Sequence, residues 1–224
     1  MSPSSPLLLQ DRAAAGRRLV EPLRQYAHRP DVIVLALPRG GVPVAYEVAM
    51  ALEVRLDLML VRKLGAPSNE EFALGAIASG GIQILNDHAL RAHPIDQATF
   101  DAVVAREKRE LLRREQAYRG TREPVPLKDQ VVILIDDGLA TGASMMAAIQ
   151  AVRLQAPSRI VVAVPVAPIE TVEALRREVD ELICPVVPDW FMSLGHWYMD
   201  FSQTSDAEVI KLLQRARQRE AGIE

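Results

Sequence analysis

The sequence predicts an α/β fold built on a mainly parallel sheet with helices on both faces. Three observations support this prediction. Short, continuous apolar runs, typical of strands that are buried on both faces, recur along the chain. Segments with helical periodicity separate several of these runs. Glycines and polar side chains directly follow two of the runs, which is where open α/β sheets bind ligands.

The first half of the chain is expected to form seven elements. Residues 11–27 place Leu19 and Leu23 on one helical face and arginines mostly on the other. The segment 96–118 alternates opposite charges at helical spacing and ends at Gly120, which predicts a long, charged helix. We therefore predict helices over 11–27, 42–52 and 96–118, and strands over 32–37, 56–61, 73–78 and 82–85.

The second half continues the alternation. A proline-spaced linker, 123–126, precedes the most apolar run of the chain, 131–135. We predict strands over 131–135, 159–164 and 182–187, and helices over 142–155 and 169–179.

Composition limits the classes of partner. The chain has 224 residues, the length of one α/β domain with a small appendage. A formal net charge of −3 gives no electrostatic footprint for nucleic acid. No apolar stretch approaches the roughly 18 residues of a membrane span. We therefore expect neither nucleic acid nor a membrane as a partner.

The expected compartment is the cytoplasm. Cys184 is the single cysteine of the chain, which excludes an intramolecular disulfide and fits a reducing compartment. The N-terminal segment has neither the basic region nor the small-residue cleavage site of a signal peptide.

The most informative stretch begins at the apolar run 131–135. Two adjacent carboxylates, Asp136 and Asp137, follow it, and a short segment of small and hydroxyl residues then leads into an apolar helix. This segment contains Ala140, Thr141, Gly142, Ala143 and Ser144. Backbone N–H groups, two hydroxyls and a helix N-terminus form a cradle for phosphate, whereas the acids suit sugar hydroxyls or a metal-bound water. The stretch therefore predicts a ribose 5-phosphate site.

This stretch resembles the phosphoribosyl pyrophosphate (PRPP) loop of the type I phosphoribosyltransferases. The resemblance implies that Asp136 and Asp137 are catalytic residues that hold the ribose hydroxyls and contact Mg²⁺ directly or through water. It implies that residues 140–144 hold the 5′-phosphate. A response-regulator or Rossmann-like strand end with a chance aspartate pair is the alternative, although the common nucleotide-loop patterns are absent.

The family resemblance also implies a domain plan. It predicts the type I phosphoribosyltransferase fold as a single domain over 1–224, with a core over about 28–187. A small hood would be built from the N-terminal helix and about 188–224. Because family members commonly self-associate, a homodimer is expected as well.

A second motif, Leu37-Pro38-Arg39-Gly40-Gly41, ends the first buried strand. Glycines let a backbone approach a ligand closely, and Arg39 supplies a cation. The motif resembles the pyrophosphate loop of the family, which often contains a cis non-proline peptide bond. The resemblance assigns Arg39, Gly40 and Gly41 to pyrophosphate. Without the family context, a helix-entry turn with a solvated arginine would explain the same residues.

A third motif, Arg62-Lys63, is expected at the end of the second strand. It is similar to the basic pair before the catalytic loop of adenine and orotate phosphoribosyltransferases, where such residues meet the pyrophosphate. Residues 68–80 would then form a mobile lid that excludes water from the reaction. The alternative is a pair of solvated basic side chains.

The C-terminal tail holds five of the ten aromatic residues of the chain. Its Val-Pro-Asp-x-Phe stretch resembles the hood of hypoxanthine phosphoribosyltransferases, which makes Phe191 the candidate for stacking on a base and Trp190 the alternate. These aromatics could equally form a minor core or a dimer contact. The arginines of the long helix at 96–118 are interpreted as a solvated face, with contact to a phosphate or a partner subunit as the alternative.

The implied reaction is Mg²⁺-dependent transfer of ribose 5-phosphate from PRPP to a small nitrogen acceptor, first of all a nucleobase, with release of pyrophosphate. The chain departs from the 6-oxopurine enzymes at Ala140, where they carry an aspartate, so the resemblance leaves the acceptor open. Two alternatives stay open. One is a regulatory protein that senses PRPP or a nucleotide without turnover, and the other is a phosphatase or phosphoribohydrolase.

Overall fold

The computed structural model describes residues 8–66, 69–92 and 95–222. Its helices are α1 (Arg12–Val20), α2 (Gly41–Leu52), α3 (Asp87–Ala92), α4 (Gln97–Arg119), α5 (Ala143–Arg153), α6 (Ile169–Arg176) and α7 (Asp206–Glu220), with 3₁₀ turns at Arg24–Tyr26, Ser79–Gly81 and Leu194–Trp197. Its strands are β1 (Val32–Ala36), β2 (Arg55–Leu58), β3 (Val61–Ala66), β4 (Asn69–Ala78), β5 (Ile82–Leu85), β6 (Val131–Ile135), β7 (Arg159–Ala163) and β8 (Glu181–Ile183).

A five-stranded parallel sheet forms the core, in the order β2-β1-β6-β7-β8. Strand β6 is the central strand and pairs with β1 on one side and β7 on the other. The loops that follow β1 and β6 therefore leave the same edge of the sheet next to each other. This topology confirms the fold class that the sequence predicts.

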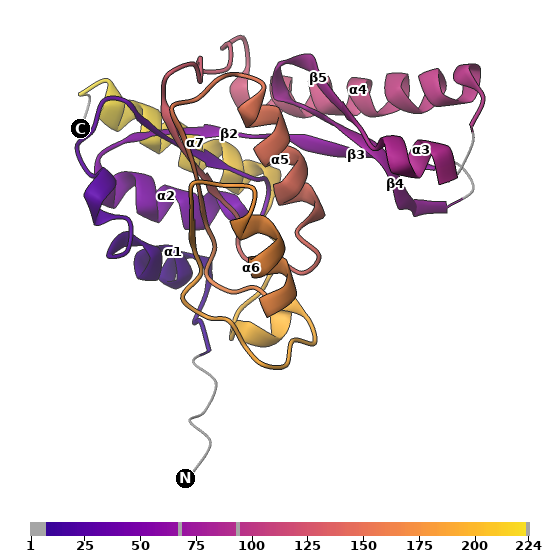
Figure 1. The fold of residues 1–224 in the computed structure, drawn as a ribbon. Helices are drawn as coiled ribbons and strands as arrows, with labels where there is room; N and C mark the ends of the chain where they lie inside the picture. Colours follow the sequence, from indigo (N-terminus) through magenta and orange to yellow (C-terminus); the bar gives the residue numbers. More distant parts are fainter. Residues whose placement is uncertain (1–7, 67–68, 93–94, 223–224) are drawn as a thin grey trace.

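Helices cover both faces of this sheet (Figure 1). Alternate residues of β1 show the division: Val34 packs with α1, α2 and α7, whereas Ile33 packs with α5 and α6. All five residues of β1 and of β6 are buried. Because each face of a parallel sheet meets helices, both faces must be apolar, which explains the continuous apolar runs. Full burial of each Val, Leu or Ile side chain contributes about 1.5–3 kcal/mol.

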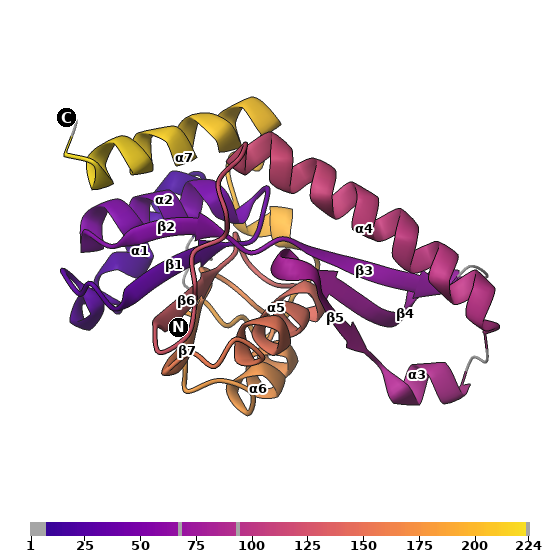
Figure 2. The same ribbon diagram turned by 90° about the horizontal axis from the view of Figure 1, so that it is seen from above.

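A three-stranded antiparallel sheet, β3-β4-β5, projects from the core and carries α3 (Figures 1 and 2). We call these four elements the arm. The long helix α4 runs along the arm and back to the N-terminal end of α7 (Figure 2). The expected second strand, 56–61, is wrong in its extent. The chain leaves the parallel sheet after Leu58 and enters the arm at Val61, so that one predicted strand is divided between two sheets.

The segment predicted as a lid, 68–80, is largely strand β4. Residue 68 lies outside the described residues, and β4 begins at Asn69. Strand β4 pairs with β3 on one side and β5 on the other, and Ala78 at its end is fully buried. The apolar residues from Leu74 to Ala78 supply the buried side chains that an antiparallel pairing needs.

Several predicted element ends differ from the structure; for example, the strand expected over 73–78 begins at Asn69 and the helix expected over 169–179 ends at Arg176. The helix expected over 11–27 ends at Val20, and a 3₁₀ turn over Arg24–Tyr26 follows. Pro22 explains this break, because proline has no N–H to donate and its ring clashes with the carbonyl oxygen one turn earlier in the helix. The last strand is also shorter than predicted and covers only Glu181–Ile183.

Helix α7 was not expected from the sequence. Its signal is nevertheless present, because Ser205 accepts a hydrogen bond from the N–H of Glu208 (3.1 Å) in the S-x-x-E arrangement of a capping box. Val209, Leu213 and Ala216 then recur at helical spacing and are fully buried.

Among the described residues, no helix combines the length and apolar character needed to cross a bilayer.

A buried ion pair fixes α4 to the edge of the core. The Arg119 Nε lies 3.0 Å from Asp57 Oδ1 on β2, and the two side chains are only 3% and 9% exposed. Arg119 also donates to the carbonyl oxygen of Leu58 and contacts Glu115 on its own helix. These contacts hold the last turn of α4 to β2, the strand after which the chain enters the arm.

We expect Arg119→Met to lower the free energy of unfolding by about 3–5 kcal/mol, because it leaves Asp57 buried without its cation. Chemical denaturation measures this loss. The exposed Arg113→Gln on the same helix serves as the control and should cost less than about 1 kcal/mol. Adding Asp57→Leu to Arg119→Met should recover part of the loss, and a double variant no more stable than Arg119→Met would contradict the assignment.

Candidate functional site

The two adjacent aspartates lie at the carboxyl end of the central strand. Asp136 is half-buried, and its Oδ1 accepts the N–H of Asp137 at 2.9 Å. Removal from water, together with the neighbouring Asp137 carboxylate, raises the pKa of Asp136 well above its usual range. Two acids placed side by side in partial burial favour a bound cation or hydroxyl donors, which relieve this repulsion.

Two distant residues, Arg12 and Tyr198, hold Asp137. The Nε of Arg12, the first residue of α1, donates to its Oδ2 at 2.7 Å. The Arg12 guanidinium in turn donates to the carbonyl oxygen of Ser202 (2.6 Å) and lies 4.1 Å from the centre of the Phe201 ring. The Tyr198 hydroxyl donates to the carbonyl oxygen of Asp137 at 2.5 Å. The N-terminal helix and the tail therefore meet at the second acid.

Sequence reasoning missed Arg12 and Tyr198. Burial beside Asp137 raises the pKa of Tyr198, so that its hydroxyl remains a donor throughout the ordinary pH range. The Tyr198 position carries a local signal, because it belongs to the aromatic cluster of the tail. Arg12 carries none beyond its place after Asp11, which accepts the N–H of Ala14 and caps α1.

The loop after β1 packs directly on the acids. The Pro38–Arg39 peptide bond is cis, as the resemblance led us to expect. A Cβ atom on Gly40 would lie 2.1 Å from Asp137 Oδ2, so only glycine allows this approach. Arg39 points toward α7, where its Nη1 lies 3.5 Å from Asp206 Oδ1. The backbone of this loop therefore lies against Asp136 and Asp137, and the Arg39 side chain extends from it toward α7.

The segment 140–144 forms the turn into α5. Gly142 precedes the helix with a φ of 71°, a conformation that glycine adopts without cost. Ala140, Thr141, Ala143 and Ser144 are exposed, whereas Gly142 is buried. The first N–H groups of an eleven-residue helix lie here without partners in the helix itself, and the Thr141 hydroxyl oxygen lies 3.4 Å from the N of Ala143. This is the geometry of an anion site.

A cavity of about 80 Å³ joins these loops. Its lining consists of Leu37, Pro38, Met59, Leu60, Val61, Arg114, Asp136 and Ser144. The ends of β1 and β6, the start of α5 and the link between β2 and β3 thus meet at one point of the sheet edge. Arg114, from α4, was not among the expected site residues.

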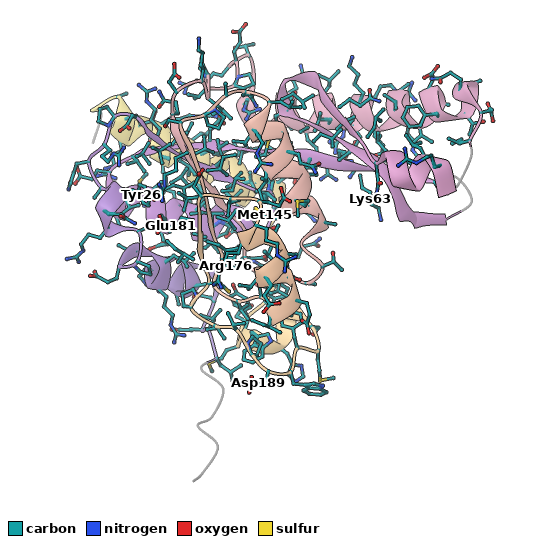
Figure 3. All side chains as sticks on the ribbon, in the orientation of Figure 1. Tyr26, Lys63, Met145, Arg176, Glu181 and Asp189 are labelled. Atoms are coloured by element: carbon teal, nitrogen blue, oxygen red, sulfur yellow. The ribbon has the colours of Figure 1, made fainter. Side chains whose placement is uncertain are left out.

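Arg62 and Lys63 do not end the second strand but lie on β3 in the arm. Both Arg62 Nε and Nη2 donate to Glu107 Oε2, at 2.9 and 2.6 Å, and the Glu107 side chain is only 7% exposed. Lys63 instead lines a second cavity, of about 440 Å³, between the arm and α5, where Ser144 also lies. Figure 3 shows Lys63 on the arm, apart from the core. Lys63 and Ser144 therefore line one cavity, whereas Arg62 is paired with Glu107 of α4.

The two stacking candidates differ in exposure. The Trp190 residue is 72% exposed, whereas Phe191 packs partly against the core. Asp189, their neighbour, lies far from the arm that carries Lys63 (Figure 3). Leu194, farther along the tail, reaches the loop after β6, where a Cβ on Gly138 would meet its Cδ1 at 2.3 Å. The tail thus borders the acids on the side opposite the arm.

Comparison with known proteins identifies one family. The sequence profile of the phosphoribosyl transferase domain matches residues 8–201. Two proteins of Mycobacterium tuberculosis, from strains CDC 1551 / Oshkosh and ATCC 25618 / H37Rv, are 43% identical over 209 residues, and their names assign them provisionally to the phosphoribosyl transferases. The match covers 93% of this chain and 47% of each relative, so the chain spans about half the length of these proteins.

Solved structures show the same fold. The protein TT1426 from Thermus thermophilus is 44% identical, with a TM-score of 0.82 over 93% of this chain and 98% of that chain. The AQ2163 protein from Aquifex aeolicus, 12% identical with a TM-score of 0.51 over 82% of this chain and 78% of that chain, shares the fold alone.

We expect Gly40→Ala to destabilise the protein by about 1–3 kcal/mol, because the new methyl group must displace the Asp137 carboxylate from its place beside Arg12. Denaturant titration measures the loss. In an Asp137→Ala background every side-chain atom that the methyl group would strike within 3 Å is absent, so Gly40→Ala should cost far less there. Equal losses in the two backgrounds would show that the clash is not the cause.

Proposed function

The chain belongs to the phosphoribosyl transferase family, and from this premise we propose that it transfers ribose 5-phosphate from PRPP to a nitrogen acceptor and releases pyrophosphate. The observation that carries the proposal is the meeting of three motifs at one cavity. Pro38 comes from the proposed pyrophosphate loop and Asp136 from the acid pair. Ser144 comes from residues 140–144, the turn into α5 that is the proposed phosphate site. A donor with a phosphate at one end, a diol in the middle and a diphosphate at the other matches this sequence of groups.

Each part of PRPP has a proposed partner. The 5′-phosphate binds the N–H groups and hydroxyls of residues 140–144 at the N-terminus of α5. The ribose hydroxyls donate to Asp136 and Asp137. Asp137 retains acceptor sites for this purpose, because a carboxylate offers about four lone pairs and Arg12 occupies one of them. The diphosphate lies against the backbone of Arg39, Gly40 and Gly41.

The reaction exchanges one bond at C1′ of the ribose for another. The lone pair of the acceptor nitrogen forms the new bond, and the bond from C1′ to the diphosphate oxygen breaks. Its electron pair leaves with the diphosphate, and the acceptor nitrogen loses its proton to water. Negative charge therefore grows on the leaving group, where fixed N–H donors and arginine stabilise it.

The acid pair fits Mg²⁺. Asp136 offers carboxylate oxygen to a polar cavity, and Mg²⁺ binds one or two carboxylates together with substrate phosphates and retains several waters. Asp136, directly or through water, and Asp137 through its remaining acceptor sites are the residues that would hold the ion. When bound, the ion would neutralise negative charge on the diphosphate.

The acceptor would approach from the side of the tail. Trp190 and Phe191 are the proposed stacking residues for a planar base, with Trp190 the more exposed of the two. Ala140 has no group that could handle a ring proton, and its carbonyl oxygen already accepts the Thr171 hydroxyl (2.6 Å). A nucleobase remains our first expectation for the acceptor, and cytoplasmic location and a homodimer remain predictions.

One observation favours a second candidate function, the sensing of PRPP or a nucleotide without turnover. Arg12 neutralises the charge of Asp137, and both side chains are nearly buried, 12% and 11% exposed. A site with one neutralised acid can bind a phosphorylated sugar and remain poor at catalysis. Saturable PRPP binding with no product from any acceptor would support this candidate.

We expect pyrophosphate release from Mg-PRPP to require one base from a panel of purines and pyrimidines. The double variant Asp136→Asn/Asp137→Asn should lose at least about 100-fold of the rate, because the diol and the metal lose their carboxylates. Asp101→Asn, which removes an exposed carboxylate bonded only within α4, is the matched control and should retain the rate. Release without any acceptor would indicate a phosphoribohydrolase or phosphatase instead.

Removal of divalent cations should abolish PRPP turnover. We expect chelation with EDTA to lower the rate by about two orders of magnitude or more, because the metal neutralises the developing charge, and added Mg²⁺ should restore it. Ribose 5-phosphate, which lacks the diphosphate, should bind with little dependence on the metal, as titration calorimetry can measure. Full turnover in EDTA would contradict the metal assignment without affecting the family assignment.

A further inference from the structure

Arg114 is the cation of the cavity at the sheet edge. Of the eight described residues that line this cavity, Arg114 alone carries positive charge, and it faces the same space as Pro38 and Asp136. It comes from α4, a helix that lies between β5 and β6 in the sequence, outside the elements that form the parallel sheet.

One carboxylate orients the Arg114 side chain and leaves its outer donors available. Its Nε donates to Glu110 Oε1 at 2.8 Å, one helical turn earlier. Its Nη1 and Nη2 atoms donate to no residue that the structure describes, and the side chain is 34% exposed. The fork of a guanidinium held in this way matches two oxygens of a phosphate.

The carboxylate that holds Arg114 also binds a second arginine of α4. Glu110 also accepts two hydrogen bonds from Arg113, at 2.8 and 2.9 Å, so a single carboxylate serves two arginines. These contacts lower the pKa of Glu110 to about 2, and it stays ionised in the physiological range. Glu110 is therefore shared by two arginines and is not the partner of Arg114 alone.

The position of α4 over the cavity is fixed by a chain of contacts. Tyr118, one turn beyond Arg114, donates to Asp206 Oδ1 at 2.7 Å, and Arg39 Nη1 lies 3.5 Å from the same oxygen. Asp206 begins α7, so α4, α7 and the loop after β1 meet at one carboxylate. Figure 2 shows α4 reaching α7 at this end.

The basic residue expected to meet the diphosphate, Arg62, is committed elsewhere. Its guanidinium donates twice to Glu107, which also accepts from Arg106 (2.9 Å) and is nearly buried. Freeing Arg62 would leave the Glu107 carboxylate buried with less compensation, which is costly. Arg114 needs no such rearrangement.

We propose that Arg114 is a binding residue for the diphosphate of the donor, supplied by α4 at the cavity that Pro38 also lines. This inference rests on the proposed function and adds a residue to it. The guanidinium fork would take two phosphate oxygens, and its charge would stabilise the diphosphate as the bond to C1′ breaks.

The test compares Arg114→Gln with Arg113→Gln. Both variants remove an arginine from the same turn of α4 and one partner from Glu110, but only Arg114 lines the cavity. Affinities for inorganic pyrophosphate with Mg²⁺, for Mg-PRPP and for ribose 5-phosphate are measured by titration calorimetry, and thermal unfolding checks the fold of each variant.

We expect Arg114→Gln to weaken pyrophosphate and PRPP binding by roughly 10- to 100-fold, because charged hydrogen bonds to phosphate are lost. Ribose 5-phosphate should bind within about twofold of the wild type, since its phosphate is proposed to bind the N–H groups of residues 140–144 and not the Arg114 guanidinium. Arg114→Lys should recover part of the loss of pyrophosphate binding. Arg113→Gln should match the wild type for all three ligands.

Two results would overturn the inference: pyrophosphate affinities that are equal in the two variants, or an equal loss of ribose 5-phosphate and pyrophosphate binding in Arg114→Gln. Failure of the proposed function gives a different pattern, because the wild type itself would then bind neither PRPP nor ribose 5-phosphate. The two failures are therefore distinguishable in one set of titrations.

Discussion

Two adjacent carboxylates at the end of the central strand impose the main constraint on this structure. Asp136 and Asp137 repel each other in a partly buried site, and burial together with this repulsion raises the pKa of Asp136. The surrounding chain compensates with Arg12 on the Asp137 carboxylate and the Tyr198 hydroxyl on its carbonyl oxygen. At position 40, only a glycine leaves room for the Asp137 carboxylate. The first helix, the tail and the loop after β1 are thus all arranged around one residue.

On the other side of the site, ion pairs fix the segment that is inserted between β2 and β6. The chain leaves the sheet after Leu58, builds the arm and returns along α4, and ion pairs fix both ends of this path. Arg119 pairs with Asp57 where α4 meets the core, and Arg62 pairs with Glu107 where α4 meets the arm. These two pairs attach α4 to both the core and the arm, and a helix attached in this way can hold a cation at the sheet edge.

The local unfavourable features cluster where a ligand would bind. The acids are crowded, the α5 N-terminus presents N–H groups without helical partners, and Arg114 lines a small cavity beside Asp136. Elsewhere, apart from the buried ion pairs of α4, apolar side chains fill the core on both faces of the sheet. Proteins commonly break local rules at functional sites and compensate in the rest of the fold. A phosphorylated, hydroxyl-bearing ligand would satisfy all three features together.

The sequence alone predicted the parallel sheet, the acid pair at the end of its central strand, the turn into α5 and the cis peptide before Arg39, because apolar runs, glycine positions and a short family motif are local signals. Tertiary structure decided which distant residues join them. Arg12 lies 125 positions before Asp137, and Arg114 reaches the cavity only because the arm returns along α4. It also decided that Arg62 pairs with Glu107, 45 positions away. Such contacts depend on topology and packing, and no periodicity or spacing within a short window of sequence encodes them.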